Sequence, residues 1–353
     1  MSRRILFTGG GTAGHVTPNI ALIERLSGQG WEIAYVGSRD GIERTIMAEM
    51  DVRYFAISTG KLRRYFSWQN FIDPVRIFAG FLQSLVICLR YRPDVVFSKG
   101  GFVAVPLVMA AWLCRIPVIT HESDMTPGLA NRLCYPFARR ICVNFPQTTR
   151  YLPADKVVVT GSPVRDALLH GDARAGRRAL GLTEDKPVLL VFGGSLGATS
   201  INRAVREALD ALLARFQVVH IVGPGNLDPA FDGREGYVQR EYLSREFGDV
   251  LAAATLVVSR AGANTLYELL VTRKPHILVP LPLSASRGDQ IVNAREFEQA
   301  GMSFVIPQEE LSGESLLARV DEIMPRLAQI QANLATFEVR DSVTLITGLL
   351  TAS

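Results

Sequence analysis

The chain has 353 residues, of which 48% are hydrophobic and 20% are charged, and its formal net charge is +4. This composition is typical of a globular protein and excludes intrinsic disorder, and the length is sufficient for two domains with separate cores. The mild positive charge permits nucleic acid, phosphorylated ligands or an anionic membrane surface as partners and selects none of them.

The cysteines and the apolar runs indicate a soluble, cytosolic protein. The apolar run at 102–114 contains Pro106 and is too short to span a bilayer. The thiols lie in or beside apolar runs without the spacing of metal ligands, so we expect reduced core residues at Cys88, Cys114, Cys134 and Cys142.

A glycine-rich loop at 9–15 follows the first predicted strand, at 5–8, and leads into a helix that we expect to end near Leu26. Glycines allow the backbone to turn tightly and to approach a phosphate, with the helix N-terminus behind it. After the next strand, at 32–36, the nearest acidic residue is Asp40. That position is too late to suit the ribose of NAD, which disfavours a dehydrogenase.

Basic and large apolar side chains are mixed between residues 61 and 92. Proline fits the first helical turn, so we expect a helix to begin at Pro74 and to place Val75, Phe78, Leu82 and Leu85 on one face. A basic rim around aromatic and aliphatic groups suits an interfacial membrane site. A core segment beneath a loop explains the same pattern equally well.

The two halves of the chain repeat one pattern. The strand and turn at 95–101 match those at 256–262, and the strand and glycine loop at 187–197 match those at the N-terminus. Glycine and proline interrupt the pattern at 160–163. We therefore expect an α/β protein with two Rossmann-like, doubly wound parallel-sheet domains facing across a cleft.

Three features of the second half suit a nucleotide diphosphate. Glu268 lies early in the helix after the strand at 254–258, where it can accept hydrogen bonds from a ribose diol, although a solvated helix glutamate is the alternative. The loop at 193–195 offers backbone N–H groups and a hydroxyl to a diphosphate, or is a plain tight turn. Arg165 offers a permanently charged donor, or forms a surface ion pair.

The candidate bases lie in the first half. His15 stands in the glycine-rich turn, and Glu122 and Asp124 follow a strand, where carboxylates serve as bases or cap the next helix. The sequence contains no Asp-x-Asp pair and no zinc-ligand cluster. We therefore expect helix N-termini and protein cations, with no bound metal, to stabilise a diphosphate leaving group.

Seven motifs together resemble those of the MurG family, the peripheral membrane glycosyltransferases of bacterial peptidoglycan synthesis (glycosyltransferase family 28). They span almost the whole chain: Gly-Gly-Thr-Ala-Gly-His at 10–15, Ser-Lys-Gly-Gly-Phe at 98–102, His-Glu-Ser-Asp at 121–124, Ser-Pro-Val-Arg at 162–165, Gly-Gly-Ser-Leu-Gly-Ala at 193–198, the stretch 259–268, and Asp-Gln-Ile-Val-Asn-Ala at 289–294.

The resemblance implies a GT-B fold and an inverting hexosyltransferase that moves N-acetylglucosamine (GlcNAc) from UDP-GlcNAc to the C4 hydroxyl of the muramoyl sugar in lipid I, giving lipid II. It implies an N-terminal acceptor domain at 1–162, a donor domain at 163–335, and a last helix at 336–353 that packs back on the N-terminal domain. The implied partners are UDP-GlcNAc, lipid I, the anionic cytoplasmic face of the cell membrane and other cell-wall or division proteins. Nucleic acid, a cofactor and a tightly bound metal are not expected.

Carried over residue by residue, the resemblance assigns Glu268 to the ribose, Ser195 to the diphosphate, the Leu243 backbone to the uracil, and Gln290 with Asp289 to sugar hydroxyls. The implied donor site comprises Thr12, Ala13, Gly14, Arg165, Gly194, Ser195, Leu243, Ala263, Asn264, Thr265, Glu268, Asp289 and Gln290. The loop residues from Thr12 to His15 would also face the lipid diphosphate. The implied acceptor and membrane side comprises Gly10, Gly11, Phe71, Val75, Phe78, Phe81 and Trp112.

The chain departs from the commoner family pattern at four positions. The family more often has Gly at Ala13, Asn at Asp124, Asn at Ser162 and Gln at Asp289. These differences leave the base open among His15, Glu122 and Asp124. There are two alternatives. One is a GT-B transferase that glycosylates diacylglycerol, which differs in its acceptor. The other is a non-catalytic UDP-sugar-binding scaffold, which would transfer no sugar.

Overall fold

The computed structural model describes residues 2–11, 13–60, 69–194 and 196–353. The chain folds into two compact units. The N-terminal unit comprises Met1–Val164 and Arg340–Ser353, and the C-terminal unit is Arg165–Val339. The expected boundary at 162 lies beside the first division, and the expected last segment at 336–353 is divided between the units at Arg340.

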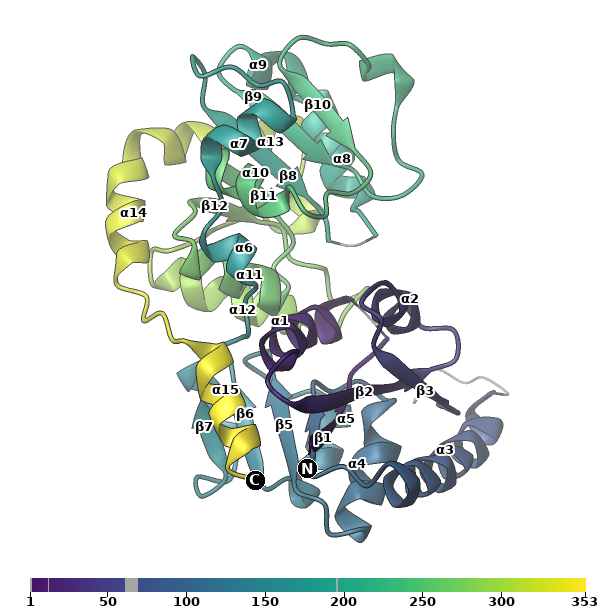
Figure 1. Ribbon diagram of the computed structural model, residues 1–353. Coiled ribbons are helices and arrows are strands. Elements are labelled where there is room, and N and C mark those ends of the chain that lie inside the picture. Colours follow the sequence, from purple (N-terminus) through teal and green to yellow (C-terminus); the bar gives the residue numbers. More distant parts are fainter. Residues whose placement is uncertain (1, 12, 61–68, 195) are drawn as a thin grey trace. The chain divides into compact units, whose positions relative to one another are not determined.

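The described part of the N-terminal unit contains a seven-stranded parallel sheet with the order β3-β2-β1-β4-β5-β6-β7 (Figure 1). This order is doubly wound, because the chain builds outward from β1 in one direction and then from β4 in the other. The strands are β1 (Arg3–Thr8), β2 (Trp31–Ser38), β3 (Arg53–Ile57), β4 (Val95–Ser98), β5 (Val118–Glu122), β6 (Arg140–Val143) and β7 (Val157–Val159).

Helices cover both faces of this sheet because both faces of its central strands are apolar. Ile5 and Phe7 of β1 belong to a core shared with α1, α2 and α15, whereas Leu6 points into a second core shared with α3 and α4. Such alternation is the period of a strand buried on both sides. The helices are α1 (Thr17–Leu26), α2 (Ile42–Glu49), α3 (Gln69–Tyr91), α4 (Ala104–Leu113), α5 (Leu129–Cys134) and α15 (Ser342–Thr351), with 3-10 helices η1 (Ala13–His15), η2 (Tyr135–Phe137) and η3 (Pro146–Tyr151).

The long helix α3 begins earlier than the sequence predicts. Pro74 lies inside it, five residues after Gln69, so the prediction that Pro74 starts the helix is wrong. Before the proline, Asp73 is buried and Gly60 packs closely against its backbone, which explains the continuation; after it, Gly80, Ser84 and Cys88 form a buried stripe at helical spacing. By length and composition alone, Asp73–Tyr91 could cross a membrane, but this stripe packs into the domain. Residues 61–68 of the predicted basic and apolar segment lie outside the described part.

The described part of the C-terminal unit contains a six-stranded parallel sheet with the order β10-β9-β8-β11-β12-β13. Its strands are β8 (Val188–Phe192), β9 (Gln217–Ile221), β10 (Tyr237–Arg240), β11 (Ala254–Ser259), β12 (His276–Leu278) and β13 (Phe304–Val305). The order repeats that of the first six strands, and β8 and β11 take the places of β1 and β4. The predicted internal repeat of two Rossmann-like domains is confirmed.

Helices and short 3-10 turns precede, connect and follow these strands, and those between strands form βαβ units. They are α6 (Asp166–Leu169), α7 (Ala173–Ala179), α8 (Thr199–Glu207), α9 (Leu209–Leu213), η4 (Pro229–Phe231), α10 (Phe247–Ala253), α11 (Ala263–Val271), α12 (Asp289–Gln299), η5 (Gln308–Glu310), α13 (Gly313–Ile323), η6 (Met324–Arg326) and α14 (Leu327–Ala335).

The last helix, α15, belongs to the N-terminal unit (Figure 1). Ile346 and Leu350 are fully buried in the same core as Leu22 and Ile23 of α1. The Asp341 carboxylate accepts a hydrogen bond from the Thr344 backbone N–H at 3.0 Å and so caps the start of the helix. The N-terminal core therefore includes both ends of the chain.

Candidate active site

Two glycine-rich turns meet at the carboxyl edge of the N-terminal sheet, after β1 and β4. The Lys99 backbone N–H donates to the Thr8 carbonyl at 2.8 Å, which ties the end of β4 to the end of β1. Gly101 has a φ of +83°, and a Cβ there would lie 2.4 Å from the Gly10 carbonyl oxygen. Only glycine fits this approach, which keeps the two turns in backbone contact.

His15, at the end of η1, is oriented by this edge. Its Nδ1 lies 3.1 Å from the carbonyl oxygen of Lys99. A carbonyl oxygen only accepts, so we assign the proton of the neutral ring to Nδ1, which leaves Nε2 as the basic nitrogen. Thr12 and the Ala13 side chain lie outside the described part of the chain, so the structure does not place them.

Glu122, a predicted base, is surrounded by hydrogen-bond donors. Its Oε2 accepts from the Gly128 N–H at 3.0 Å, from Asn131 Nδ2 at 2.9 Å and from the Tyr135 hydroxyl at 3.0 Å. Its Oε1 accepts from the backbone N–H of Asp124 at 3.1 Å. The side chain is buried and shapes the loop between β5 and α5, which argues for a positioning role.

Asp124 lies in the loop that Glu122 holds. Its carbonyl accepts from the Thr148 hydroxyl at 3.3 Å, and the residue is partly exposed. Hydrogen bonds to its N–H and its carbonyl therefore fix the backbone of Asp124 just beyond the carboxyl end of β5. Among the three predicted bases, His15 and Asp124 keep the placement that a base requires.

The corresponding edge of the C-terminal unit carries two helix N-termini. Gly194 has a φ of +93° in the loop before α8, and Gly262 precedes α11 with open space beside its Cα. Among the described residues, no side chain caps either helix, so the backbone N–H groups of the first turn, including those of Ala263, Asn264 and Thr265, suit an anion. Ser195 lies outside the described residues.

Glu268 stands on the second turn of α11 and is partly buried. Burial raises its pKa to about 7, and the nearby guanidinium of Arg165 opposes this rise. Arg165 precedes α6, and its buried Nε has no hydrogen-bond partner among the described residues. The carboxyl group of Glu268 and the guanidinium of Arg165 are therefore close enough to interact electrostatically, and Nε of Arg165 is a hydrogen-bond donor without a partner among the described residues.

Three further predicted donor residues lie in loops of the C-terminal unit or at the start of α12. Gln290 accepts from the Leu281 N–H at 3.0 Å through Oε1, which directs its amide group to other acceptors. Asp289 pairs with Arg287, with Nε 3.3 Å from Oδ1. Leu243 is buried, just beyond the end of β10. All three follow the carboxyl ends of strands, the edge at which doubly wound sheets bind ligands.

Comparison with known proteins identifies the family. Residues 5–143 match the glycosyltransferase family 28 N-terminal domain, and residues 188–345 match the C-terminal domain of that family. The chain belongs to glycosyltransferase family 28.

Among family 28 relatives, a UDP-N-acetylglucosamine–N-acetylmuramyl-(pentapeptide) pyrophosphoryl-undecaprenol N-acetylglucosamine transferase from Lachnoclostridium phytofermentans is 51% identical over 348 residues, covering 99% of this chain and 98% of that protein. A protein of the same name from Geobacillus kaustophilus is 51% identical over 335 residues, covering 95% and 94%. Acinetobacter baumannii MurG has a similar fold, with a TM-score of 0.76 at 23% identity over 99% of this chain and 100% of that one.

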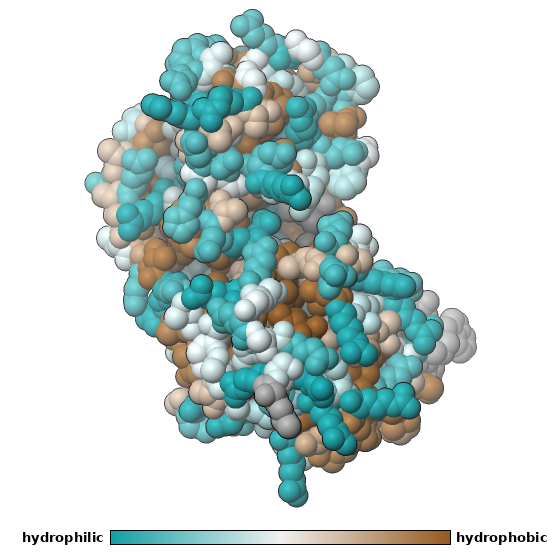
Figure 2. Space-filling view, in the orientation of Figure 1, coloured by the Kyte–Doolittle hydropathy of each residue, from teal (hydrophilic) through white to brown (hydrophobic). Residues whose placement is uncertain are grey.

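The N-terminal unit of this family 28 chain has an exposed apolar surface on α3, α4 and α5. Figure 2 shows apolar side chains interspersed with hydrophilic ones over α3 and α4. Val75 is 67% exposed, Phe78 61% and Trp112 54%. The other exposed apolar residues on α3, α4 and α5 are Leu82, Val86, Leu89, Met109, Leu113, Leu129 and Leu133.

Two expected members of this surface differ from the prediction. Phe81 and Leu85 are partly buried and pack against the core beneath α3, because they lie on the side of the helix that covers the sheet. The ring of Phe81 still stacks on Phe78 at 6.5 Å between centroids. The side chain of Phe71 lies outside the described part of the chain.

Sequence reasoning gave Arg260 no role, although it follows β11 directly. Its Nη1 donates to the Val279 carbonyl and its Nη2 to the Ser200 hydroxyl, each at 3.1 Å, and burial lowers its pKa. This cation therefore lies between the ends of β11 and β12 and the start of α8. The internal repeat could have identified Arg260, because Lys99 occupies the corresponding position after the equivalent strand, β4.

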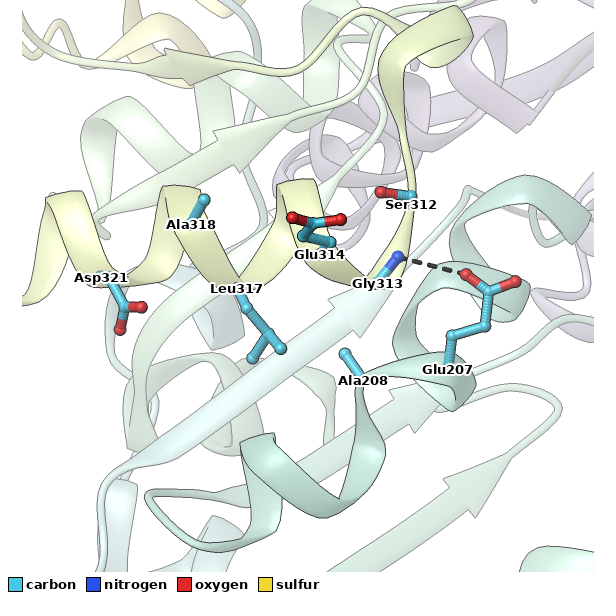
Figure 3. Close-up of a pocket in the computed structure, with 8 residues that line it drawn as sticks. All are labelled: Glu207, Ala208, Ser312, Gly313, Glu314, Leu317, Ala318 and Asp321. Atoms are coloured by element: carbon cyan, nitrogen blue, oxygen red, sulfur yellow. Dashed lines mark hydrogen bonds between the residues drawn. The ribbon is translucent and has the colours of Figure 1, made fainter.

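A separate cavity of about 590 Å³ lies in the C-terminal unit of this family 28 protein, between α8, α9 and α13 (Figure 3). Glu207, Glu314 and Asp321 line it, and Glu207 Oε2 accepts from the Gly313 N–H at 3.1 Å. The lining also includes Ala208, Ser312, Leu317 and Ala318. Its carboxylates would repel a diphosphate, so this cavity does not suit the donor.

Proposed function

We propose that this chain transfers GlcNAc from UDP-GlcNAc to the C4 hydroxyl of the muramoyl sugar in lipid I and so makes lipid II for peptidoglycan synthesis. The observation that carries this proposal is a sequence identity of 51%, over nearly the whole chain, to relatives that are named as transferases of this specificity. The two Rossmann-like domains and the ligand-binding edge of each sheet support it.

The donor is proposed to bind at the C-terminal sheet edge. Glu268 accepts hydrogen bonds from the ribose hydroxyls, and the N-termini of α8 and α11 receive the diphosphate. Arg165 supplies positive charge beside Glu268. Gln290 and Asp289, at the start of α12, hold sugar hydroxyls, and the Leu243 backbone contacts uracil. No cofactor is included in this proposal.

The proposed reaction is a direct displacement. Nε2 of His15 removes the proton from the acceptor C4 hydroxyl, whose oxygen attacks the anomeric carbon of GlcNAc from the face opposite the diphosphate. The bond from that carbon to the β-phosphate oxygen breaks, and UDP leaves with the electron pair. Helix N-termini and Arg165 stabilise the charge that grows on the diphosphate. Asp124 is the alternative base, and Glu122 positions the loop.

The apolar surface on α3, α4 and α5 is proposed to dock on the anionic cytoplasmic face of the membrane, where lipid I resides. Aromatic and aliphatic side chains would enter the interface, and Arg76, Arg90, Arg115 and Arg132, from the same helices and their ends, would contact lipid headgroups. The described residues of these helices include one acidic side chain, Asp73, which is buried.

Transfer of labelled GlcNAc from UDP-GlcNAc to a lipid I analogue, with diacylglycerol as a parallel acceptor, tests the proposed reaction. Label on the lipid I analogue alone supports it, and label on diacylglycerol alone contradicts it. His15→Gln should lose most turnover while UDP-GlcNAc binding, measured by calorimetry, is retained. Loss of turnover in Asp124→Asn with an active His15→Gln would transfer the role of base to Asp124.

Flotation with phosphatidylglycerol vesicles tests the docking surface. Phe78→Glu places a charge in the centre of the surface and should reduce vesicle binding severalfold. Leu227→Glu is the matched control, because Leu227 is a similarly exposed leucine (49%) in the C-terminal unit. Equal binding by wild type and both variants would exclude this surface.

A further inference from the structure

A buried polar cluster lies beneath the glycine-rich turns of the N-terminal unit. Lys99, the residue that follows β4, is 1% exposed. Its Nζ lies 2.6 Å from Nδ1 of His121 and 2.7 Å from Oγ of Ser123. A lysine so fully buried is rare unless its nitrogen is hydrogen-bonded, and these two contacts engage two of its N–H groups.

The protonation of His121 follows from its second partner. Its Nε2 lies 2.9 Å from the carbonyl oxygen of Gly161, so the ring donates there. Nδ1 therefore carries a lone pair that accepts from Lys99 Nζ. Burial and the neighbouring ammonium hold the pKa of His121 well below its usual value, which keeps the ring neutral.

The main chain of Lys99 completes the connection. Its N–H donates to the carbonyl of Thr8 at 2.8 Å, and its carbonyl accepts from Nδ1 of His15. One residue therefore contacts the end of β1, the candidate base, the end of β5 and the first residue of the loop that carries Asp124. None of these contacts involves the donor edge of the C-terminal unit.

We propose that Lys99 is a positioning residue for the acceptor side of the reaction, orienting His15 through its carbonyl and fixing the 123–128 loop through its side-chain nitrogen. The inference rests on the proposed function. It adds a residue to which the family resemblance assigned no role. The lysine contacts no reacting atom in this account and acts through His15 and the loop.

The charge of Lys99 changes within the pH range of ordinary assays. Burial lowers its pKa to about 7, and Glu122, Asp124 and Cys142 oppose that fall. The groups that face it are His121 and Glu122 of β5, Asp124 in the loop, Cys142 of β6 and His15 through the backbone. Cys142 stays a neutral thiol, because burial raises its pKa to about 12. Lys99 is therefore a group of this cluster whose charge changes near neutrality, beside the candidate bases.

Steady-state kinetics of the full chain with UDP-GlcNAc and a lipid I analogue provide the test. Lys99→Met keeps an unbranched side chain of nearly the same length and removes both hydrogen bonds. We expect kcat/KM for the acceptor to fall about 10- to 100-fold, as for a displaced catalytic group, with calorimetric affinity for UDP-GlcNAc unchanged. The pH at half-maximal kcat/KM should move upward, because a nearby cation no longer opposes protonation of the base.

Lys274→Met is the control for removing a lysine whose nitrogen is hydrogen-bonded within the fold, although Lys274 is only partly buried. Lys274 Nζ donates to the carbonyls of Ala252 and Ala254 in the C-terminal unit, far in sequence from either glycine turn. This variant should lower the melting temperature and leave the pH profile unchanged. Ser123→Ala removes one partner of Lys99, keeps the lysine and should show a smaller loss in the same acceptor constants.

The outcomes separate the two proposals. Wild-type protein that transfers no GlcNAc to the lipid I analogue overturns the proposed function and this inference with it. Active wild type, with Lys99→Met retaining both its acceptor constants and its pH profile, overturns the positioning role alone. If Lys99→Met fails to fold, Ser123→Ala decides, and unchanged acceptor kinetics in that variant also overturn the role.

Discussion

Binding of UDP-GlcNAc should strengthen as the pH rises from 6 to 8, because the carboxyl of Glu268 titrates in this range. Burial raises its pKa to about 7, so the ligand-free carboxyl is about one-tenth ionised at pH 6 and nine-tenths ionised at pH 8. The ionised form accepts two hydroxyl hydrogen bonds. If this form is the one that binds, the apparent Kd should fall about tenfold between these pH values.

Calorimetric titration with UDP-GlcNAc measures this dependence, because its doubly esterified diphosphate does not titrate near neutrality, unlike the terminal phosphate of UDP. Glu268→Gln keeps the shape of the side chain and removes the ionisation. It should bind more weakly at pH 8, by about 1–3 kcal/mol, with a Kd that is nearly constant from pH 6 to 8. A wild-type Kd that is equally constant would refute the reasoning.

Three further predictions concern stability. Because folding raises the pKa of Glu268 from 4.5 to about 7, the ligand-free protein should lose stability as the pH rises between these two values, with the full loss present above about 7; Glu268→Gln should therefore melt at a higher temperature than wild type at pH 8 and not at about pH 4. Glu122→Gln, which replaces one of the two accepting oxygens by an NH2 group that faces a donor, should cost about 1–3 kcal/mol of unfolding free energy by denaturant titration; lost turnover with unchanged stability would instead restore Glu122 as a base. Ile346→Ala should destabilise the N-terminal unit by about 2–5 kcal/mol, whereas the same change at the neighbouring exposed Leu345 should cost much less; equal losses at both positions would contradict the packing of α15.

Most of the fold could be predicted from the sequence because its signals are local. Strands β4, β5, β8 and β9 are buried along their whole length and each contains an apolar run, which in β8 is continuous. Glycine turns mark the carboxyl ends of β4, β8 and β9, and the same order recurs in each half. The repeat was therefore visible without any knowledge of tertiary structure.

The start of α3 could not be predicted in this way. Proline at 74 predicts a helix start, yet the helix continues through it at the cost of one backbone hydrogen bond. The compensating stabilisation on the N-terminal side of the proline comes from burial of Asp73, against whose backbone Gly60 packs. Only the folded chain brings Gly60 to that turn.

The roles within the acceptor site were equally hidden, since they depend on how the loops fold. Glu122 and Asp124 are both carboxylates in one loop, and only the positions of their donors separate a positioning group from a candidate base. His15 is oriented by a carbonyl 84 positions away. Motif spacing identifies such residues and cannot assign their hydrogen bonds.

The return of α15 to the N-terminal core has a consequence for the order of folding during synthesis. Residues 1–164 leave the ribosome first, but their core includes Ile346 and Leu350. The C-terminal unit is continuous in sequence and can complete its core before the N-terminal unit does. The half that emerges first is therefore the half that finishes folding last, and a chain shortened by its final helix would expose the apolar surface of α1.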